Sequence, residues 1–120
     1  MTELTLLYRQ VNPAWVQNGR ATSQTFKPTP KDGKCISVYD GDQINAEGAW
    51  RHFVKTLKLQ SIGTLAVTQG ECYALILDVR QDPEPFPEHV VIDFSNCETA
   101  GAIERVAKRL LLHAVERGWQ

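Results

Sequence analysis

Four side chains in this sequence are of types that together could recognise and activate a small molecule: Arg9, Ser37, Tyr39 and His89. An arginine on a strand presents a rigid pair of donors to a carboxylate or phosphate. A histidine held at the start of a strand can act as a base or as a ligand contact. Ser37 and Tyr39 stand two residues apart, so on one strand they point to the same side and can line one cleft.

Each of these residues also has a purely structural explanation. Arg9 can pair with a surface carboxylate, and the two hydroxyls are ordinary strand side chains. His89 can simply bond a loop carbonyl and so anchor the strand that it opens. The sequence leaves both interpretations open, and they differ in one respect: a site requires the four side chains to converge.

Cysteine and metal chemistry have little support. Cys72 with His89 as its base is a second enzymatic hypothesis, but Glu71 beside the thiol opposes thiolate formation. The three cysteines are an odd number without the spacing of a zinc site or disulfide framework, so we expect reduced core thiols. Phosphate-loop, dinucleotide and zinc-protease motifs are absent. We therefore expect neither a metal nor a cofactor.

Other residues suggest contact with a protein partner. The prolines Pro83, Pro85 and Pro87, together with Phe86, form a stiff strip that loses little entropy on binding. Trp15 lies among polar residues between Asn12-Pro13 and Asn18-Gly19. An exposed tryptophan is a favoured anchor for protein contacts, although the long C-terminal helix could equally cover it.

Strands and turns must position these side chains. Apolar and β-branched runs predict strands over residues 4–11, 21–26, 35–39, 62–68, 74–79 and 89–94. Asn18-Gly19 is a strong turn signal, and residues 27–33 form an exposed loop stiffened by two prolines. The alternating prolines of 82–87 exclude a helix or a central strand there.

Two amphipathic helices complete the expected fold. The first begins at Asn45, whose side chain can cap it, and presents an apolar face from Ala46 to Leu57. The second carries a stripe from Ile103 to Val115, with Ser95 and Glu98 spaced as a capping box and Gly118 at its end. Hairpin-sized links between strands favour a mostly antiparallel sheet over βαβ units. We predict an α+β fold of five or six short strands with the two helices packed on the sheet.

Length, composition and charge set the class of protein. With 120 residues, the chain fits one domain over residues 1–120. Its 13 Lys and Arg against 14 Asp and Glu give a formal net charge of -1, without the field of a nucleic-acid-binding protein. No apolar run approaches the roughly 20 residues of a membrane span, and no secretory signal opens the sequence. We expect a cytoplasmic protein that binds neither nucleic acid nor membrane.

Several segments of the chain carry a resemblance. Residues 7–13, 26–32, 37–39, 86–89 and 117–119 resemble a group of short bacterial proteins of about this length, for which no activity is agreed. A second resemblance is to ADP-ribosyltransferase-like domains, because Arg9, Ser37, Tyr39 and the helix over 46–57 follow the order of that family. The later catalytic glutamate of that family has no clear counterpart here, Glu88 being a nominal candidate.

Two functional hypotheses of different kinds follow. One is a non-catalytic module that binds a protein partner, such as an accessory or immunity-type component of a bacterial gene cluster. The other, implied by the second resemblance, is a small ADP-ribosyltransferase-like or nucleotide-handling enzyme that uses Arg9 with Ser37, Tyr39 or His89. Convergence of Arg9, Tyr39 and His89 in one pocket favours the enzyme, and their dispersal favours the binding module.

Overall fold

Five strands form one antiparallel sheet in the computed structural model, which describes all residues from 1 to 120. The strands run in the order β5-β1-β4-β7-β6 across the sheet. Their bounds are Leu6–Gln10 for β1, Cys35–Asp40 for β4, Thr64–Thr68 for β5, Asp78–Gln81 for β6 and His89–Asp93 for β7. The predicted α+β class and mostly antiparallel sheet are confirmed.

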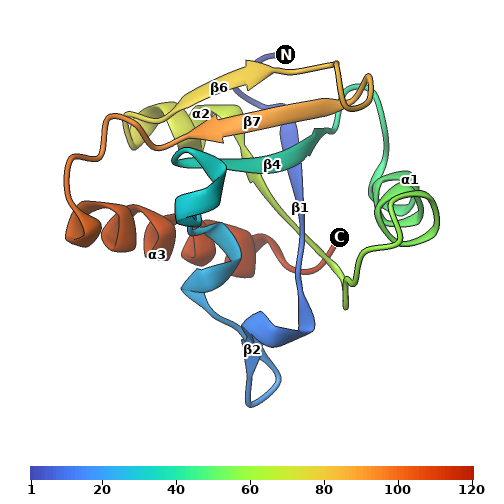
Figure 1. The fold of residues 1–120 in the computed structure, drawn as a ribbon, viewed down its shortest axis with the longest axis horizontal. Helices are drawn as coiled ribbons and strands as arrows, with labels where there is room; N and C mark the ends of the chain where they lie inside the picture. The colour runs from blue at the N-terminus through green and yellow to red at the C-terminus, as the bar shows by residue number, and fades with distance from the viewer.

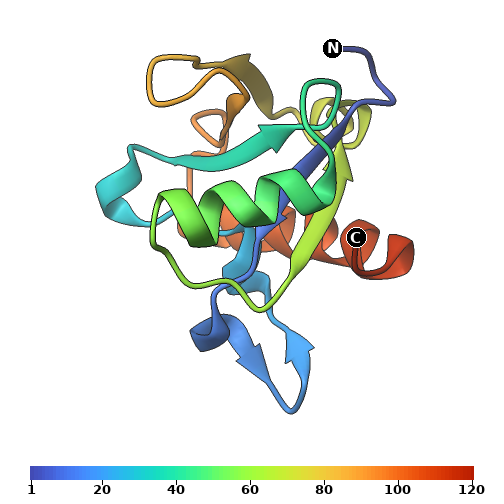
Figure 2. The same cartoon turned by 90° about the vertical axis from the view of Figure 1, so that its right-hand side faces the viewer.

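Helices cover both faces of this sheet (Figures 1 and 2). The C-terminal helix α3 (Ala100–Arg117) lies on one face. On the other lies α1 (Ala46–Arg51), which continues without a break into the π-helix η4 (His52–Thr56). Figure 2 shows the helix over 46–56 in front of the sheet and α3 behind it. Because neighbouring strand residues point to opposite faces, each strand supplies side chains to both layers.

The two faces differ in the size of their apolar clusters. Under α3, seventeen buried residues form the main core, including Leu7 of β1, Val38 of β4 and Leu110 of α3. Under α1 lies a smaller cluster around Tyr8 and Tyr39. These two residues directly follow Leu7 and Val38 in their strands and therefore point to the opposite face of the sheet. The face beneath α1 and η4 therefore has the smaller apolar cluster, and the polar strand residues Ser37 and His89 lie on it beside Tyr39.

The helix ends agree with the sequence at two positions and differ at a third. Asn45 caps α1, its side-chain oxygen accepting the Gly48 N–H at 2.8 Å. Gly118 ends α3 with a φ of 91°, a left-handed value that suits glycine. The predicted Ser95–Glu98 cap is wrong: Thr99 caps α3 by accepting the Ala102 N–H at 3.0 Å. Ser95 is instead bonded to the carboxylate of Asp93, which ties it to the end of β7.

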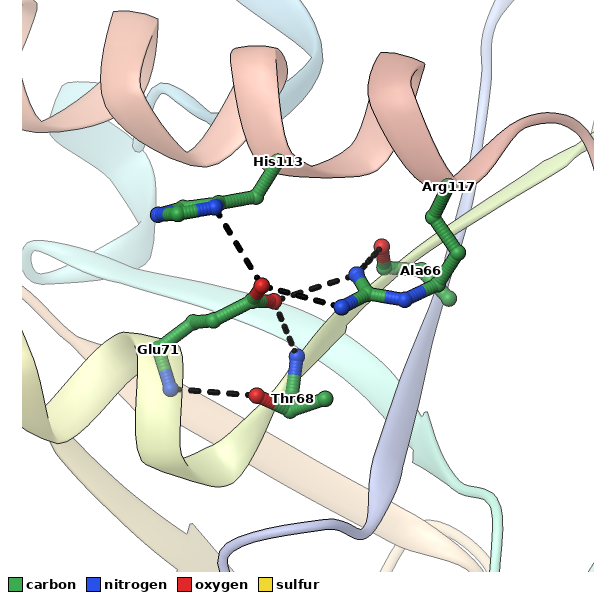
Figure 3. A network of polar contacts seen from close by, with 5 residues as sticks. All are labelled: Ala66, Thr68, Glu71, His113 and Arg117. Carbon is green, nitrogen blue, oxygen red and sulfur yellow. Dashed lines mark hydrogen bonds and ion pairs between the residues drawn. The ribbon is translucent and has the colours of Figure 1, made fainter.

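A short helix stands where the sequence predicted a link between two strands and the first residue of the second strand. Residues Gln69–Ala74 form α2, and β6 runs over Asp78–Gln81, so the strand expected over 74–79 is wrong before Asp78 and ends two residues later than predicted. Thr68 and Glu71 make a capping box, in which each side chain binds the other residue's backbone N–H. Figure 3 shows the Glu71 carboxylate reaching across to His113 and Arg117 of α3. The Thr68-x-x-Glu71 spacing was the available signal, and it was missed.

The segment between β1 and β4 is mostly turns. Val16–Gln17 (β2) and Arg20–Ala21 (β3) pair around Asn18 and Gly19, so the predicted turn is confirmed. This hairpin projects from the body of the molecule (Figure 1). The strand predicted over 21–26 is wrong beyond Ala21, because Ser23–Phe26 form the 3-10 turn η2, which buries Phe26 in the main core. Pro13–Trp15 (η1) and Pro30–Asp32 (η3) are two further such turns.

The whole chain has a radius of gyration of 13.1 Å. That is the value of a compact chain of this length, for which the scaling law gives about 13 Å at 100 residues. None of its helices combines the length and the apolar character that a membrane crossing requires.

Candidate functional site

Arg9, Ser37, Tyr39 and His89 all line one pocket. The pocket has a volume of about 290 Å³ and opens between the sheet, the end of the π-helix and the proline loop. The four residues therefore converge, as the enzyme hypothesis requires. Besides these four, its walls are formed by Gln10, Val38, Phe53, Leu57, Leu59, Pro85 and Phe86.

Strand register brings the serine and the histidine together. Tyr39 of β4 lies opposite His89 of β7, and Ser37 lies opposite Val91. Ser37 and His89 are therefore diagonal neighbours on the same face, at a separation within reach of long side chains. Ser37 is exposed, whereas only 6% of His89 is accessible to solvent. The hydroxyl stands at the mouth of the pocket and the imidazole in its wall.

The hydrogen bonds of His89 determine which of its nitrogens carries the proton. Nδ1 lies 2.9 Å from the backbone carbonyl oxygen of Asp82, which can only accept, so Nδ1 is the donor. In the neutral imidazole, Nε2 is then the acceptor. It lies 2.9 Å from Oγ of Ser37, whose hydroxyl therefore donates to it. A hydrogen bond in this direction, from the serine hydroxyl to the imidazole nitrogen, is the one that a base needs in order to take the serine proton.

Asp82 holds the imidazole from the other side. Besides its carbonyl, its carboxylate oxygen Oδ2 lies 3.4 Å from Nδ1 of His89. Its own N–H donates to the His89 carbonyl oxygen at 2.9 Å, which closes the loop over 82–89 at its base. Sequence reasoning missed Asp82. The signal that could have found it is its position at the start of a proline loop between two strands that pair.

A second hydroxyl–imidazole pair lies beside the first. Tyr39 Oη is 2.8 Å from Nδ1 of His52, the first residue of the π-helix. The ring of Phe86 packs among Tyr39, His52 and His89, with centroids 4.5 to 5.0 Å away. Burial, and then the negative charge of Glu88, raise the pKa of Tyr39 above its ordinary value. Tyr39 therefore stays a neutral phenol that can donate a hydrogen bond.

His52 reaches Tyr39 from the π-helix η4. π-helical turns within α-helices often occur at functional sites.

Arg9 has a different role from the one its type suggested. Its Nε donates to the carbonyl of Thr25 at 2.8 Å and its Nη1 to the carbonyl of Ser37 at 2.9 Å. The guanidinium also lies over the ring of Trp15, 4.9 Å from the centroid. Desolvation lowers the pKa of Arg9 to about 10, against the opposing charge of Asp32.

The bond from Arg9 to the Ser37 carbonyl links β1 and β4 beside the pocket. The ladder between β1 and β4 ends at the pair of Tyr8 and Tyr39. Beyond it the guanidinium of Arg9, rather than a backbone N–H, satisfies the Ser37 carbonyl. Arg9 thus joins strands that have parted and fixes the backbone of the residue that carries the hydroxyl.

The residues predicted to contact a partner lie in separate places. Trp15 is half-buried, packed against the main core as well as Arg9. Pro85 and Phe86 line the pocket, and Phe86 also packs on the smaller cluster. Pro83 and Pro87 border a polar hollow with Met1, Asp40, Asp42, Gln43 and Gln81. Partner binding by these residues stays a prediction.

Cys72 does not lie beside His89. Its thiol is fully buried in the main core, on the opposite face of the sheet from the pocket. Burial, with the negative charge of Glu71 adding to it, raises its pKa to about 12. Cys35, Cys72 and Cys97 are all free thiols. No group of three or more His, Cys, Asp or Glu side chains is arranged to hold a metal ion.

Comparison of the chain with protein-family models, with curated proteins and with solved structures finds no match.

Proposed function

We propose that the pocket is an active site in which His89 activates the hydroxyl of Ser37 for attack on a small acyl compound. The observation that carries the proposal is the orientation of one imidazole, with Nδ1 donating to Asp82 and Nε2 accepting from Ser37. A nucleophile, a base and a group that orients the base are the three parts of nucleophilic catalysis by serine. The corresponding reactions are hydrolysis and acyl transfer.

Each step can be written with the residues present. As Oγ of Ser37 bonds to the substrate's carbonyl carbon, its proton passes to Nε2 of His89 and the π electron pair moves to the carbonyl oxygen. Collapse of this intermediate expels the leaving alcohol, which takes the proton from His89. A water or an acceptor alcohol then repeats the sequence on the acyl-serine and regenerates the hydroxyl.

The walls of the pocket favour a small apolar acyl group. Phe53, Leu57 and Phe86 are among its apolar lining residues, and its volume of about 290 Å³ suits a compound of a few carbon atoms to one aromatic ring. The hydroxyl of Tyr39 lies in the same wall, 2.8 Å from Nδ1 of His52. Aryl esters of short acids are therefore the substrates to try first.

The ADP-ribosyltransferase-like alternative stays a prediction. It requires Arg9 to hold a phosphate, and two of the guanidinium nitrogens are engaged by the carbonyls of Thr25 and Ser37. This engagement favours a positioning role for Arg9 over a role in substrate binding. We place the enzyme in the bacterial cytoplasm, and its three free thiols are consistent with a reducing compartment.

A fluorophosphonate probe tests the proposal, because it phosphonylates serines that a neighbouring base has activated. We expect one probe per chain, located on Ser37 by peptide mass spectrometry. Labelling should vanish in Ser37→Ala and slow by about 100-fold or more in His89→Gln, which loses the base. Ser95→Ala, a change at another exposed serine, is the matched control and should label like wild type. Absence of labelling in the folded wild-type protein would overturn the proposal.

A further inference from the structure

A second cavity lies on the opposite face of the molecule, between the β2–β3 hairpin and the C-terminal half of α3. Its volume is about 470 Å³. We call it the α3 groove and define it by its lining residues. These are Gly19, Arg20 and Ala21 of the hairpin, Leu65 of β5, Lys108, Leu111, Leu112 and Val115 of α3, and Gly118 and Trp119 after it.

The floor of the α3 groove is apolar and open to water. Leu112 is 48% exposed, Val115 54% and Trp119 52%, although they lie close together along one side of the helix and its end. The buried stripe of α3 consists of other residues, Ala107, Leu110 and Ala114. Val115 was expected in that stripe, so this expectation is wrong. The helix thus carries a second apolar stripe that the sheet leaves uncovered.

The tryptophan wall of the groove is held in place. Gly118 turns the chain off the helix, and the N–H of Gln120 donates to the carbonyl of Thr64 at 3.0 Å. The indole of Trp119 packs on Gly63, where a Cβ atom would stand 3.0 Å from Cε3 of the ring. The groove is therefore formed before any ligand arrives, which lowers the entropic cost of binding.

The charges of the groove have one sign. Arg20 and Lys108 are its only charged lining residues, and both are cations. No carboxylate lies within 4.0 Å of Arg20. Lys108 has one at 3.9 Å, on Glu104, whose other oxygen is bound by Lys27 at 3.1 Å. Positive charge therefore remains at the groove.

We propose that the α3 groove binds a single-chain anionic amphiphile, a fatty carboxylate. The hydrocarbon chain would cover Leu112, Val115 and Trp119, and the carboxylate would pair with Arg20 and Lys108. A cavity of this volume, apolar with two like charges, fits the usual pattern of small-molecule sites. The groove is walled on two sides and carries two cationic side chains. Binding to an anionic lipid surface usually depends on a cluster of four to eight Lys and Arg side chains, so a single amphiphile fits the groove better. The inference is independent of Ser37 and His89, which lie on the other face of the sheet.

Titration calorimetry with three probes of equal chain length tests the inference: dodecanoate, dodecanol and dodecylammonium, each below its micelle concentration. We expect dodecanoate to bind wild-type protein about tenfold or more tighter than dodecanol, because its carboxylate can pair with both Arg20 and Lys108; tenfold corresponds to about 1.4 kcal/mol. Dodecylammonium should bind most weakly.

Variants separate the contribution of charge from that of apolar contact. Arg20→Glu should remove the preference for dodecanoate while dodecanol still binds, and Val115→Asp should abolish the binding of both. Leu4→Asp, at an 84% exposed leucine outside the groove, is the matched control and should bind as wild type does. Equal affinity for the three probes, or no binding at all, would overturn the proposal. So would concentration-dependent dimerisation that Val115→Asp removes, because a second copy would then be the occupant.

Discussion

Nε2 of His89 lies 2.9 Å from Oγ of Ser37, although 52 positions separate the two residues in the sequence. The register of β4 against β7 creates this contact, and the arginine of β1 fixes the backbone on which the hydroxyl stands. Two strands and one loop must therefore form before the pair exists.

Leucines of α3 should differ in their contribution to stability. Leu110 is fully buried in the main core, so Leu110→Ala should lower the free energy of unfolding by about 2–5 kcal/mol through lost burial and a cavity. Leu112→Ala, two residues away at a 48% exposed leucine, is the matched control and should change it by about 0.5 kcal/mol or less. Urea unfolding measures both. Equal losses would mean that the buried face of α3 has been assigned incorrectly.

Glu71 should make stability depend on pH in the acid range. Arg117, Thr68 and His113 hold its pKa below the ordinary 4.5 against the effect of burial. A carboxylate whose pKa is lower in the folded state stabilises that state above its unfolded pKa, and this stability is lost as the pH falls through the folded value. Glu71→Gln should therefore cost about 1–2 kcal/mol near pH 7.

The same pH dependence supplies the control for that variant. Below the folded pKa of Glu71, the wild-type side chain is neutral like glutamine, so the two proteins should approach the same stability. Urea unfolding at neutral pH and in acid gives the difference at each pH. A difference that stays constant below pH 4.5 would show that packing of the side chain, rather than its charge, is responsible.

The phenol of Tyr39 should ionise only under strongly alkaline conditions. Burial, and then Glu88, raise its pKa above the ordinary 10.0, because both disfavour the phenolate. The absorbance of phenolate in wild type minus that in Tyr39→Phe isolates this one residue. We expect the difference to appear at a higher pH in the folded protein than in urea. Ionisation at the same pH in both would contradict the burial of the hydroxyl.

The thiol of Cys72 should be inert in the native protein. Its pKa is raised to about 12 by burial, with a further contribution from Glu71, so almost no thiolate exists at neutral pH. Iodoacetamide should therefore leave Cys72 unmodified in the native state and alkylate it in urea, as measured by peptide mass spectrometry. Rapid native alkylation at Cys72 would return it to consideration as a nucleophile.

Local patterns in the sequence determined much of the fold. Runs of apolar and β-branched residues were sufficient to predict β1, β4, β5 and β7, because such side chains pack well on a pleated sheet. The caps at Asn45 and Gly118 were readable for a similar reason: each depends on a few consecutive residues. The same local rules failed at Ser95, where the carboxylate of Asp93 competed for the cap, and at α2, where an apolar run concealed a capping box.

The candidate site was only partly readable. Residue types singled out Arg9, Ser37, Tyr39 and His89, and the structure places all four around one pocket. Their roles depended on contacts between distant segments. Arg9 donates to backbone carbonyl oxygens instead of being free to bind a ligand anion. Asp82 orients His89 through its backbone carbonyl, a group that every residue has and that leaves no signal in the sequence. His52 contacts Tyr39 from the π-helix η4.

Tertiary structure alone decided which polar groups meet, for a physical reason. A hydrogen bond forms within about 3 Å, and the order and register of strands, which set that distance, follow from the packing of the entire sheet. The same holds for the second stripe of α3: periodicity shows that Leu112 and Val115 are apolar, but the area of the sheet sets how much of the helix is covered. Types and spacings of residues were thus properties of the sequence, whereas the Ser37–His89 pair and the α3 groove are properties of the folded chain.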